Sequence, residues 1–324
     1  MMKVLNKDFT KANLELNLNP YWVTGFIDGE GSFIIAMLSS TGPTKKKVSL
    51  RLSVTQKSHS SGVLYDLKNF FECGSVIPSS KDCMRYVVQG KNDIINKIIP
   101  HFCDYPLITS KQLNFESFKE AAEIVQKGEH LSLEGITKIV ELKKKMNKNR
   151  SFDELFSYLN SKKIELNPFW VQAFIDAEGN FGTLITKSEA TGKIVTRNRL
   201  SVSQSTHDYL VLKAIKEFFK AGNLSPSCGT LLGEDGSSSI RLEKARLCAD
   251  NSFYYNSSPY TFIPFFENYP LYTRKYLDFQ DFKIFYKLKK DKYYLTDEGF
   301  AEMSKLAKLM NSGRDDLSKS RRLN

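Results

Sequence analysis

The chain has 324 residues, which is enough for two ordinary domains or for one large domain built from two similar halves. It carries 47 Lys and Arg against 36 Asp and Glu, and its net charge of +11 is expected of a protein that meets a polyanion, either nucleic acid or an anionic membrane surface. The 41% of hydrophobic residues excludes wholesale disorder, and no apolar run approaches the ~20 residues that span a bilayer. Because no signal-peptide pattern is present, we expect a soluble, intracellular protein with no membrane partner. The five cysteines form no CxxC pair, so any metal should be held by oxygen ligands.

Two segments begin with Asn-Pro, which places a helix N-cap before a proline at the first helical position. They predict helices from Asn19 to about Asp28 and from Asn167 to about Asp176. After the first helix, the hydrophobic periodicity predicts a hairpin with its turn at 42–47, then a helix, two short strands and two helices. The predicted strands are 33–39, 48–57, 75–78 and 85–89, and the predicted helices are 61–72, 92–102 and 110–127.

Three sequence blocks occur twice in the same order, which indicates a duplicated domain. The last pair is spaced about 16 residues wider than the others, and a Gly/Ser-rich insertion around 229–239 accounts for the difference. A predicted helix at 133–145 should cross between the halves, and the basic run 143–150 should be a solvated linker. The blocks are 19–33 and 167–181, 51–59 and 199–207, and 105–119 and 269–283.

The duplication predicts an α+β fold of two pseudo-symmetric αββαββα halves. We place the first repeat at 1–130, the connecting helix and linker at 131–160, and the second repeat at 161–324. Two copies favour a pseudo-twofold pair over a solenoid.

Small residues recur four apart in both Asn-Pro helices, as Gly25 and Gly29 and as Ala173 and Ala177. Positions i and i+4 share one helix face, so a second backbone can approach closely there. This favours packing of the two helices on each other, the alternative being that each face packs on its own sheet.

Such a crossing would bring together Glu30 and Glu178, which we expect just after the last helical turn of each copy. The alternative is that both are ordinary surface residues, yet a carboxylate facing the negative end of a helix dipole is disfavoured. Two adjacent carboxylates are stabilised by a cation between them, and Mg²⁺ suits oxygen ligands. The carbonyls of Gly29 and Ala177 could complete the site. Mn²⁺ or Ca²⁺ could occupy the same positions, and Ca²⁺ is expected not to support a metal-dependent reaction there.

Strand parity predicts the sheet faces that point away from the core. Antiparallel strands can lie in the major groove of DNA, where arginine reads guanine. These faces are therefore candidate DNA-binding surfaces. The alternative is that each is an ordinary half-solvated face of a sheet. The candidates are Ile34, Ala36, Leu38, Ser40, Arg51, Ser53 and Thr55 in the first half, and Asn180, Gly182, Leu184, Thr186, Ser188, Arg199, Ser201 and Ser203 in the second.

The segments VTGFIDGEG at 23–31 and VQAFIDAEG at 171–179 resemble the two motifs of the LAGLIDADG homing endonucleases in their single-chain form. The likeness extends over about 19–287. It implies a monomeric saddle over duplex DNA and divalent-metal-dependent cleavage of both strands of a long, asymmetric site, leaving short 3′ overhangs. In the family, the eighth motif position is the metal-binding acid, which falls on Glu30 and Glu178.

The resemblance also implies roles for two further matched pairs. Gln56 and Gln204 correspond to a polar residue that orients the attacking water, and Lys111 and Lys275 to a lysine near the scissile phosphates, where it would stabilise developing charge. His59 and His207 correspond as well, and for them a phosphate contact or a helix-start hydrogen bond is favoured over a general base.

Two other functions fit the same scaffold. One is an intron RNA maturase, with host intron RNA as a second partner, and the other is a DNA-binding regulator without catalysis. Retention of both glutamates favours cleavage. The abundance of Lys, Asn, Phe, Ile and Tyr is typical of AT-rich organellar genomes and suggests a mitochondrial intron as the source.

Overall fold

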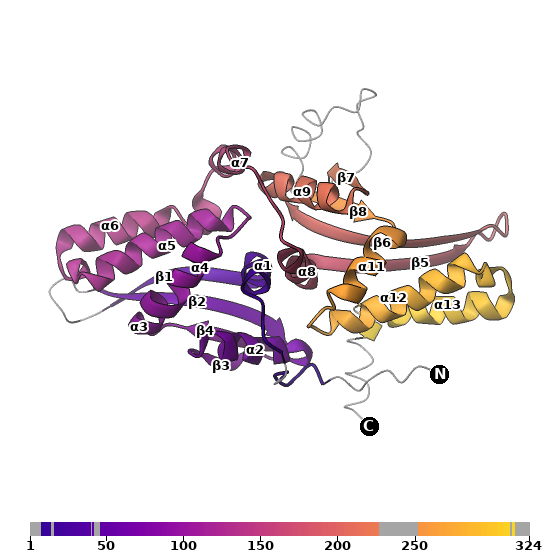
Figure 1. The fold of residues 1–324 in the computed structure, drawn as a ribbon, viewed down its shortest axis with the longest axis horizontal. Helices are drawn as coiled ribbons and strands as arrows, with labels where there is room; N and C mark the ends of the chain where they lie inside the picture. The colour runs from indigo at the N-terminus through magenta and orange to yellow at the C-terminus, as the bar shows by residue number, and fades with distance from the viewer. Residues whose placement is uncertain are drawn as a thin grey trace. The chain divides into compact units, whose positions relative to one another are not determined.

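The computed structural model describes residues 8–13, 16–39, 41, 46–226, 252–311 and 313–314. They form two compact units that divide between Ala177 and Glu178 (Figure 1). Among these residues no helix is both long enough and apolar enough to cross a membrane. Ser40, residues 42–45 of the predicted hairpin turn and the insertion at 229–239 lie outside the described residues.

The first unit follows the predicted order, with additional helices at its end. Short 3-10 helices occur at Ser58–Ser60, Glu129–Leu131 and Asn147–Asn149, and a π-helical turn at Ile94–Ile98. The other elements are α1 (Pro20–Glu30), β1 (Gly31–Ser39), β2 (Lys46–Lys57), α2 (Gly62–Phe71), β3 (Ser75–Ser80), β4 (Cys83–Val88), α3 (Lys91–Asp93), α4 (Ile99–Asp104), α5 (Lys111–Gln126), α6 (Leu133–Lys144), α7 (Phe152–Asn160) and α8 (Pro168–Glu178), whose last residue opens the second unit.

The second unit repeats this order after α8. It has 3-10 helices at Thr206–Asp208 and Tyr293–Leu295. The other elements are β5 (Gly179–Lys187), β6 (Ile194–Ser205), α9 (Tyr209–Phe219), β7 (Asn223–Pro226), β8 (Ser252–Ser257), α11 (Pro259–Asn268), α12 (Lys275–Lys290) and α13 (Asp297–Leu309).

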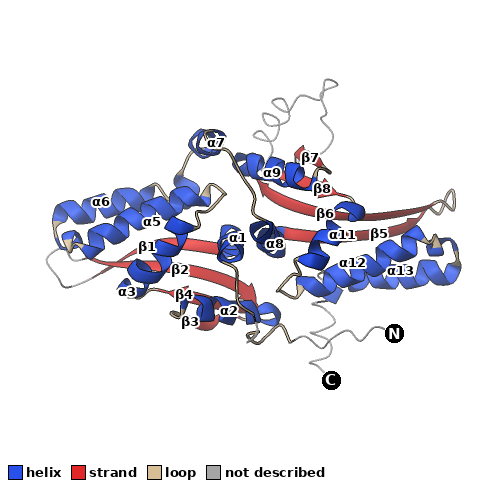
Figure 2. Ribbon diagram, in the orientation of Figure 1, coloured by secondary structure: helices blue, strands red, loops and turns tan. Residues whose placement is uncertain are grey.

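Each unit contains one four-stranded antiparallel sheet, seen as a single layer of strands in Figure 2. The strand orders are β1-β2-β4-β3 and β5-β6-β8-β7. The registers also match, since Gly31 pairs with Val54 and Gly179 with Val202. The predicted α+β fold with two equivalent halves is confirmed.

A phenylalanine at the same place in each first strand forms the centre of each core. Phe33 is 1% exposed, and its ring centroid lies 5.3–5.4 Å from those of Phe102, Phe115 and Phe118. Phe181 is fully buried among the rings of Phe262, Phe266, Phe279 and Phe282. These contacts attach the helices to one face of each sheet, and the opposite face keeps the alternate side chains.

The two motif helices pack on each other within the first unit, as their small residues predict. Asn19 caps α1 by accepting the backbone N–H of Tyr21 at 2.9 Å, and Asn167 does the same for Phe169 at the start of α8. A Cβ added at Gly25 would lie 2.5 Å from the carbonyl oxygen of Trp170, so only glycine allows this approach. Because α8 up to Ala177 packs against α1, this part of α8 belongs to the first unit, and the two units divide at the end of α8.

The helix α6 packs against α5 of its own unit, so the prediction that it crosses between the halves is wrong. The prediction that 143–150 is only a solvated linker is also wrong, because the Arg150 side chain is 8% exposed. Its Nη2 donates to the carbonyl oxygen of Leu113 at 3.1 Å and to Ser117 Oγ at 3.0 Å. The segment therefore fastens α6 to α5.

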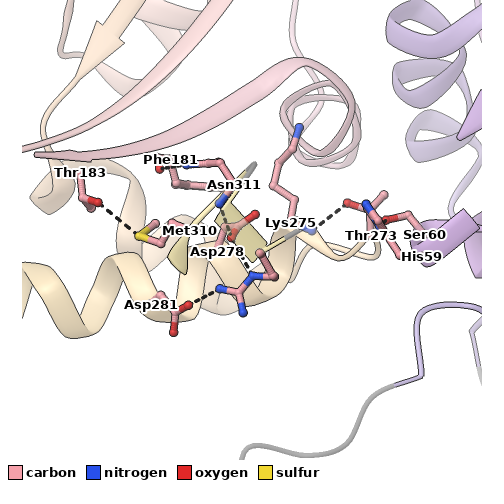
Figure 3. A network of polar contacts seen from close by, with 11 residues as sticks. His59, Ser60, Phe181, Thr183, Thr273, Lys275, Asp278, Asp281, Met310 and Asn311 are labelled. Carbon is pink, nitrogen blue, oxygen red and sulfur yellow. Dashed lines mark hydrogen bonds and ion pairs between the residues drawn. The ribbon is translucent and has the colours of Figure 1, made fainter. Parts of the chain in front are cut away.

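At the end of the second unit, an arginine that follows α13 likewise bonds to the preceding helix, α12, and Figure 3 shows this network of polar contacts. The sequence Met-Asn-x-x-Arg occurs at 146–150 and at 310–314. Asp278 Oδ1 on α12 accepts the backbone N–H of Asn311 and Arg314 Nε, each at 3.0 Å, and Arg314 also pairs with Asp281. The Asn311 side chain donates to the carbonyl oxygen of Phe181 on β5 at 3.2 Å. We call these two segments the latches.

Candidate functional site

Glu30 is the last residue of α1, and Glu178 is the last residue of α8. Both side chains are half-buried. The prediction that they follow the last helical turn is therefore wrong, since Gly29 remains helical and the chain leaves the helix only at Gly31. A Cβ at Gly31 would lie 2.6 Å from the carbonyl oxygen of Ile27, so this tight exit into β1 requires glycine. Because Glu178 opens the second unit, its proximity to Glu30 stays a prediction.

Lys111 is the first residue of α5, and its ammonium lies at the C-terminal end of α1. Nζ donates to the carbonyl oxygens of Ile27 at 2.9 Å and Gly29 at 3.1 Å. A cation at this end of a helix is stabilised by the helix dipole. The Ile27 carbonyl oxygen accepts the Gly31 N–H as well as Lys111 Nζ. The fold thus brings Lys111 and Gly29 together beside Glu30, three of the residues singled out from the sequence.

Lys275 begins α12 as Lys111 begins α5. Its backbone N–H donates to Thr273 Oγ1 at 3.2 Å, a bond drawn in Figure 3, just as the backbone N–H of Lys111 donates to Thr109 Oγ1 at 3.2 Å. The two lysines therefore start their helices with the same local geometry.

Asp28 is a site residue that the sequence reasoning missed. It is 4% exposed, and its two oxygens accept from the backbone N–H of Ile108 (2.8 Å) and Thr109 (3.2 Å), from Thr109 Oγ1 (2.6 Å) and from Trp170 Nε1 (2.8 Å). Burial raises the pKa of Asp28, while these hydrogen bonds and the charge of Lys111 act in the opposite direction. The sequence signal that could have identified Asp28 is a single carboxylate within an otherwise apolar helix face, and it occurs in both motifs.

This carboxylate sets the position of Lys111. It holds the backbone of Ile108 and Thr109, directly before α5, against the end of α1. Asp28 is therefore a positioning residue for the lysine.

The predicted glutamines lie one residue before the end of their strands, Gln56 opposite Met84 and Gln204 opposite Phe253. Both side chains are half-buried. By strand alternation they lie on the core-facing side, with Val54 and Val202, rather than on the outward face. No described contact joins them to Glu30 or Glu178.

The two predicted histidines lie in the 3-10 helices that follow these strands. His59 Nδ1 lies 2.9 Å from Ser60 Oγ, and His207 Nε2 lies 3.5 Å from Asp208 Oδ2. Both contacts are to the next residue in the chain, and the roles of the two histidines stay predictions.

The outward faces of the long strands carry the predicted DNA-binding residues. Phe33 and Ile35 are buried, whereas Ile34 and Ala36 are half-buried and Leu38 is exposed. Within the first half the described candidates lie on this outward face by register: Ile34, Ala36, Leu38, Arg51, Ser53 and Thr55.

In the second half the described candidates show the same alternation, and all of them are exposed or half-buried. Ser188 lies just beyond β5, in the turn to β6, where its N–H donates to the carbonyl oxygen of Lys193 at 2.9 Å. The candidates on the strands are Asn180, Gly182, Leu184, Thr186, Arg199, Ser201 and Ser203.

Ser53 is the exception to the prediction of outward-exposed side chains. Its side chain is only 7% exposed, because this small residue lies between its register partners Ser32 on β1 and Val87 on β4. A direct contact of Ser53 with a ligand is not supported by this burial.

The eight described strands contain eight basic residues and no Asp or Glu, in a chain that has 36 acidic residues. Six of the basic residues lie on the outward faces, and the other two, Lys46 and Lys187, are exposed at strand ends. The buried Nε of Arg51 has no hydrogen-bond partner within the described ranges. The six outward residues are Lys47, Arg51, Lys57, Arg85, Arg197 and Arg199.

A cage of three or more His, Cys, Asp or Glu side chains does not occur among the described residues. Mg²⁺ does not require such a cage, since it commonly binds through one or two carboxylates, waters and substrate phosphates. Glu30 and the Gly29 carbonyl at the end of α1 fit that donor set, because a carbonyl oxygen has two lone pairs and Lys111 uses one of them.

The family model described as LAGLIDADG endonuclease matches residues 23–122 and 173–286. Among curated relatives, "Probable intron-encoded endonuclease 3" of Neurospora crassa is 28% identical over 313 residues, covering 93% of this chain and 56% of the relative. "Probable intron-encoded endonuclease 2" of the same organism is 28% identical over 319 residues, covering 91% of this chain and 65% of the relative. The chain thus spans between half and two thirds of the length of these relatives.

Among solved structures, the chain is similar to the I-SmaMI LAGLIDADG homing endonuclease bound to cleaved DNA, with a TM-score of 0.77 and 28% identity. This match covers 92% of our chain and 98% of the other. I-SmaMI bound to an uncleaved DNA target in the presence of calcium ions gives a TM-score of 0.77 at 27% identity, covering 91% and 99% of the two chains.

Proposed function

Because the chain belongs to the LAGLIDADG endonuclease family, we propose that it is an intron-encoded homing endonuclease that cuts both strands of a long, asymmetric duplex-DNA site. The observation that carries this proposal is the complete lack of carboxylates on the eight described strands, whose outward faces present basic and small polar side chains. Phosphate contacts by Lys and Arg provide most of the affinity for DNA, and arginine can also read guanine in the major groove.

The carboxylates are instead found where the two motif helices end. We propose that Glu30 and Glu178, with the carbonyls of Gly29 and Ala177, hold Mg²⁺. When bound, the ion supplies a Lewis acid and an activated water for hydrolysis of the phosphodiester. Calcium in the DNA-bound I-SmaMI structure supports the choice of a divalent ion.

The remaining residues orient and stabilise the reacting groups. Lys111, anchored on the carbonyls of Ile27 and Gly29, places a positive charge beside Glu30, where negative charge develops on the phosphate. Lys275 has the matching role in the second half. Gln56 and Gln204 orient the attacking water through their amide groups.

The relatives support a source in organellar introns. Both Neurospora crassa relatives are described as probable intron-encoded endonucleases, and a 26% identical Saccharomyces cerevisiae relative is described as an uncharacterized mitochondrial protein. We propose that this chain is likewise encoded in a mitochondrial intron, works as a monomer and cuts the intronless form of its host gene.

Cleavage of a randomised duplex library tests the proposed function. The purified chain is incubated with the library and Mg²⁺, and the ends of the cut molecules are sequenced. We expect one family of long sites without twofold symmetry, cut on both strands with short 3′ overhangs, and no product in EDTA. Failure to enrich any cut site at full Mg²⁺ would contradict the proposal.

A further inference from the structure

Arg85 on β4 lies on the outward face of the first sheet and was not singled out from the sequence. Its register partners are Thr55 on β2 and Ile77 on β3. Directly paired residues point to the same face of a sheet, so Arg85 shares the face of Thr55 and Arg51.

Two hydroxyl groups hold the Arg85 guanidinium in place. Nη2 donates to Ser79 Oγ at 2.6 Å, and Nε donates weakly to Thr55 Oγ1 at 3.4 Å. The pairing of β3 with β4 shifts register between Pro78 and Ser80, and such irregularities re-aim side chains on a sheet. The guanidinium is thus positioned by its own sheet.

The partners of Arg85 are neutral, which distinguishes it from the arginines of the two latches. Arg150 and Arg314 both pair with carboxylates, whereas the described residues provide no ion pair for Arg85. A guanidinium has five N–H donors, and the two hydroxyls occupy two of them. Arg85 therefore presents an uncompensated charge and further donors on the outward face.

We propose that Arg85 reads one guanine in the half-site contacted by the first sheet, an inference that rests on the proposed DNA-binding function. A bidentate pair of arginine with guanine O6 and N7 is the commonest specific contact in the major groove. A side chain that is already ordered loses less conformational freedom on binding, which favours affinity. The fixed guanidinium also defines which base position it reaches.

Within the described residues of the second sheet, no arginine occupies the equivalent position. Thr55 corresponds to Ser203, and the register partner of Ser203 on the described part of β8 is Tyr254. The guanine preference should therefore occur in one half-site only, and it contributes to the asymmetry of the target.

Selection of bound duplexes from a randomised library, in Ca²⁺ to separate binding from cleavage, tests this inference. Wild type, Arg85→Ala, Arg85→Lys, Ser79→Ala and Tyr254→Ala are compared after circular dichroism has verified their folding. We expect the wild-type site to contain one guanine whose preference falls roughly 10- to 100-fold in Arg85→Ala, with all other positions kept. Arg85→Lys should not restore it, because lysine lacks the fork geometry.

Two comparisons make the outcome specific. Ser79→Ala should weaken the same guanine preference in part, since it removes the hydroxyl that orients Nη2, and Tyr254→Ala should change positions in the other half-site only. An unchanged selected sequence in Arg85→Ala, or an equal loss of affinity for every sequence, would overturn the inference and leave the proposed function standing. If wild type selects no sequence at all, the proposed function itself fails.

Discussion

The carboxylate of Asp28 is buried and accepts four hydrogen bonds, one from α8 and three from the segment before α5. Asp28→Asn keeps the size but replaces one acceptor oxygen by an NH₂ group, so at least one buried donor loses its partner. The expected cost is about 1–3 kcal/mol in the free energy of unfolding, measured by urea denaturation.

Thr109→Val is the matched control for this variant. It removes the hydroxyl bond to Asp28 and the acceptor of the Lys111 backbone N–H, but it keeps both backbone bonds to Asp28, so it should cost less than Asp28→Asn. Equal stability of Asp28→Asn and wild type would contradict a positioning role for this carboxylate.

His101 is 9% exposed and lies among the rings of Phe70, Phe71, Phe102 and Tyr105. Burial lowers the pKa of His101 from 6.5 to about 4. The folded state therefore resists protonation, so the stability that neutral His101 provides is complete above pH 6.5 and is lost as the pH falls toward 4.

His101→Phe should remove this pH dependence while keeping an aromatic ring in place. Between pH 7 and pH 4.5 we expect wild type to lose roughly 2 kcal/mol more than the variant, as measured by urea denaturation at both values. Parallel losses in the two proteins would show that His101 does not contribute.

At the scale of elements, the two latches fasten the last helix of each repeat to the helix before it. Arg150→Ala removes bonds to the Leu113 carbonyl and to Ser117, and Arg314→Ala leaves Asp278 and Asp281 without their cation. Each substitution should lower the free energy of unfolding by about 2–4 kcal/mol.

Arg150→Lys and Arg314→Lys serve as the charge-preserving comparison. Because lysine cannot bond two partners through a planar fork, both should stay well below wild-type stability. Thermal unfolding that is unchanged in the alanine variants would refute the proposed fastening role.

The main helices and strands of each half were predictable because local signals agreed with the fold. The Asn-Pro dipeptides predicted the starts of α1 and α8, and the alternation of apolar residues predicted β1, β2, β5 and β6. The third and fourth strands of the second half were blurred by the insertion, although β7 and β8 flank it. Neither α7 nor α13 was predicted, although both helices bury residues at i, i+4 spacing: Leu155 and Leu159 on α7, and Gly299 and Met303 on α13.

The residues of the candidate site could be predicted where they occur in both copies of a duplicated block. They could not be predicted where their role depends on tertiary contacts. Glu30 and Lys111 were found from matched blocks, but contacts between Lys111 and the end of α1 require the tertiary fold. Arg150 was mistaken for a linker residue because charge runs are usually solvated, whereas the repeated Met-Asn-x-x-Arg pattern was the available signal. Arg85 needed the sheet register before its face could be assigned.

For the whole molecule, the basic strand faces predict a strong dependence of DNA binding on salt. Six outward basic residues that each neutralise a phosphate would give a slope of about −5 for log K against log salt, or a loss of roughly 10³-fold between 50 and 200 mM. Fluorescence anisotropy with the selected duplex measures this slope.

The double variant Arg51→Ala, Arg199→Ala should make the slope shallower by up to about 2, because each residue neutralises at most one phosphate. Lys138→Ala, at an exposed position of α6, should leave the slope unchanged. An affinity that is insensitive to salt would exclude binding through these faces.

The central claim is that a carboxylate at the end of each motif helix is needed to cut DNA. Its most direct test is the conversion of a supercoiled plasmid that carries the selected site, with Mg²⁺, by wild type, Glu30→Gln and Glu178→Gln. We predict a linear product from wild type, a loss of at least 10²-fold in its rate of formation in either variant, and unchanged binding of the same site. Linear product formed by both variants as fast as by wild type would contradict the account.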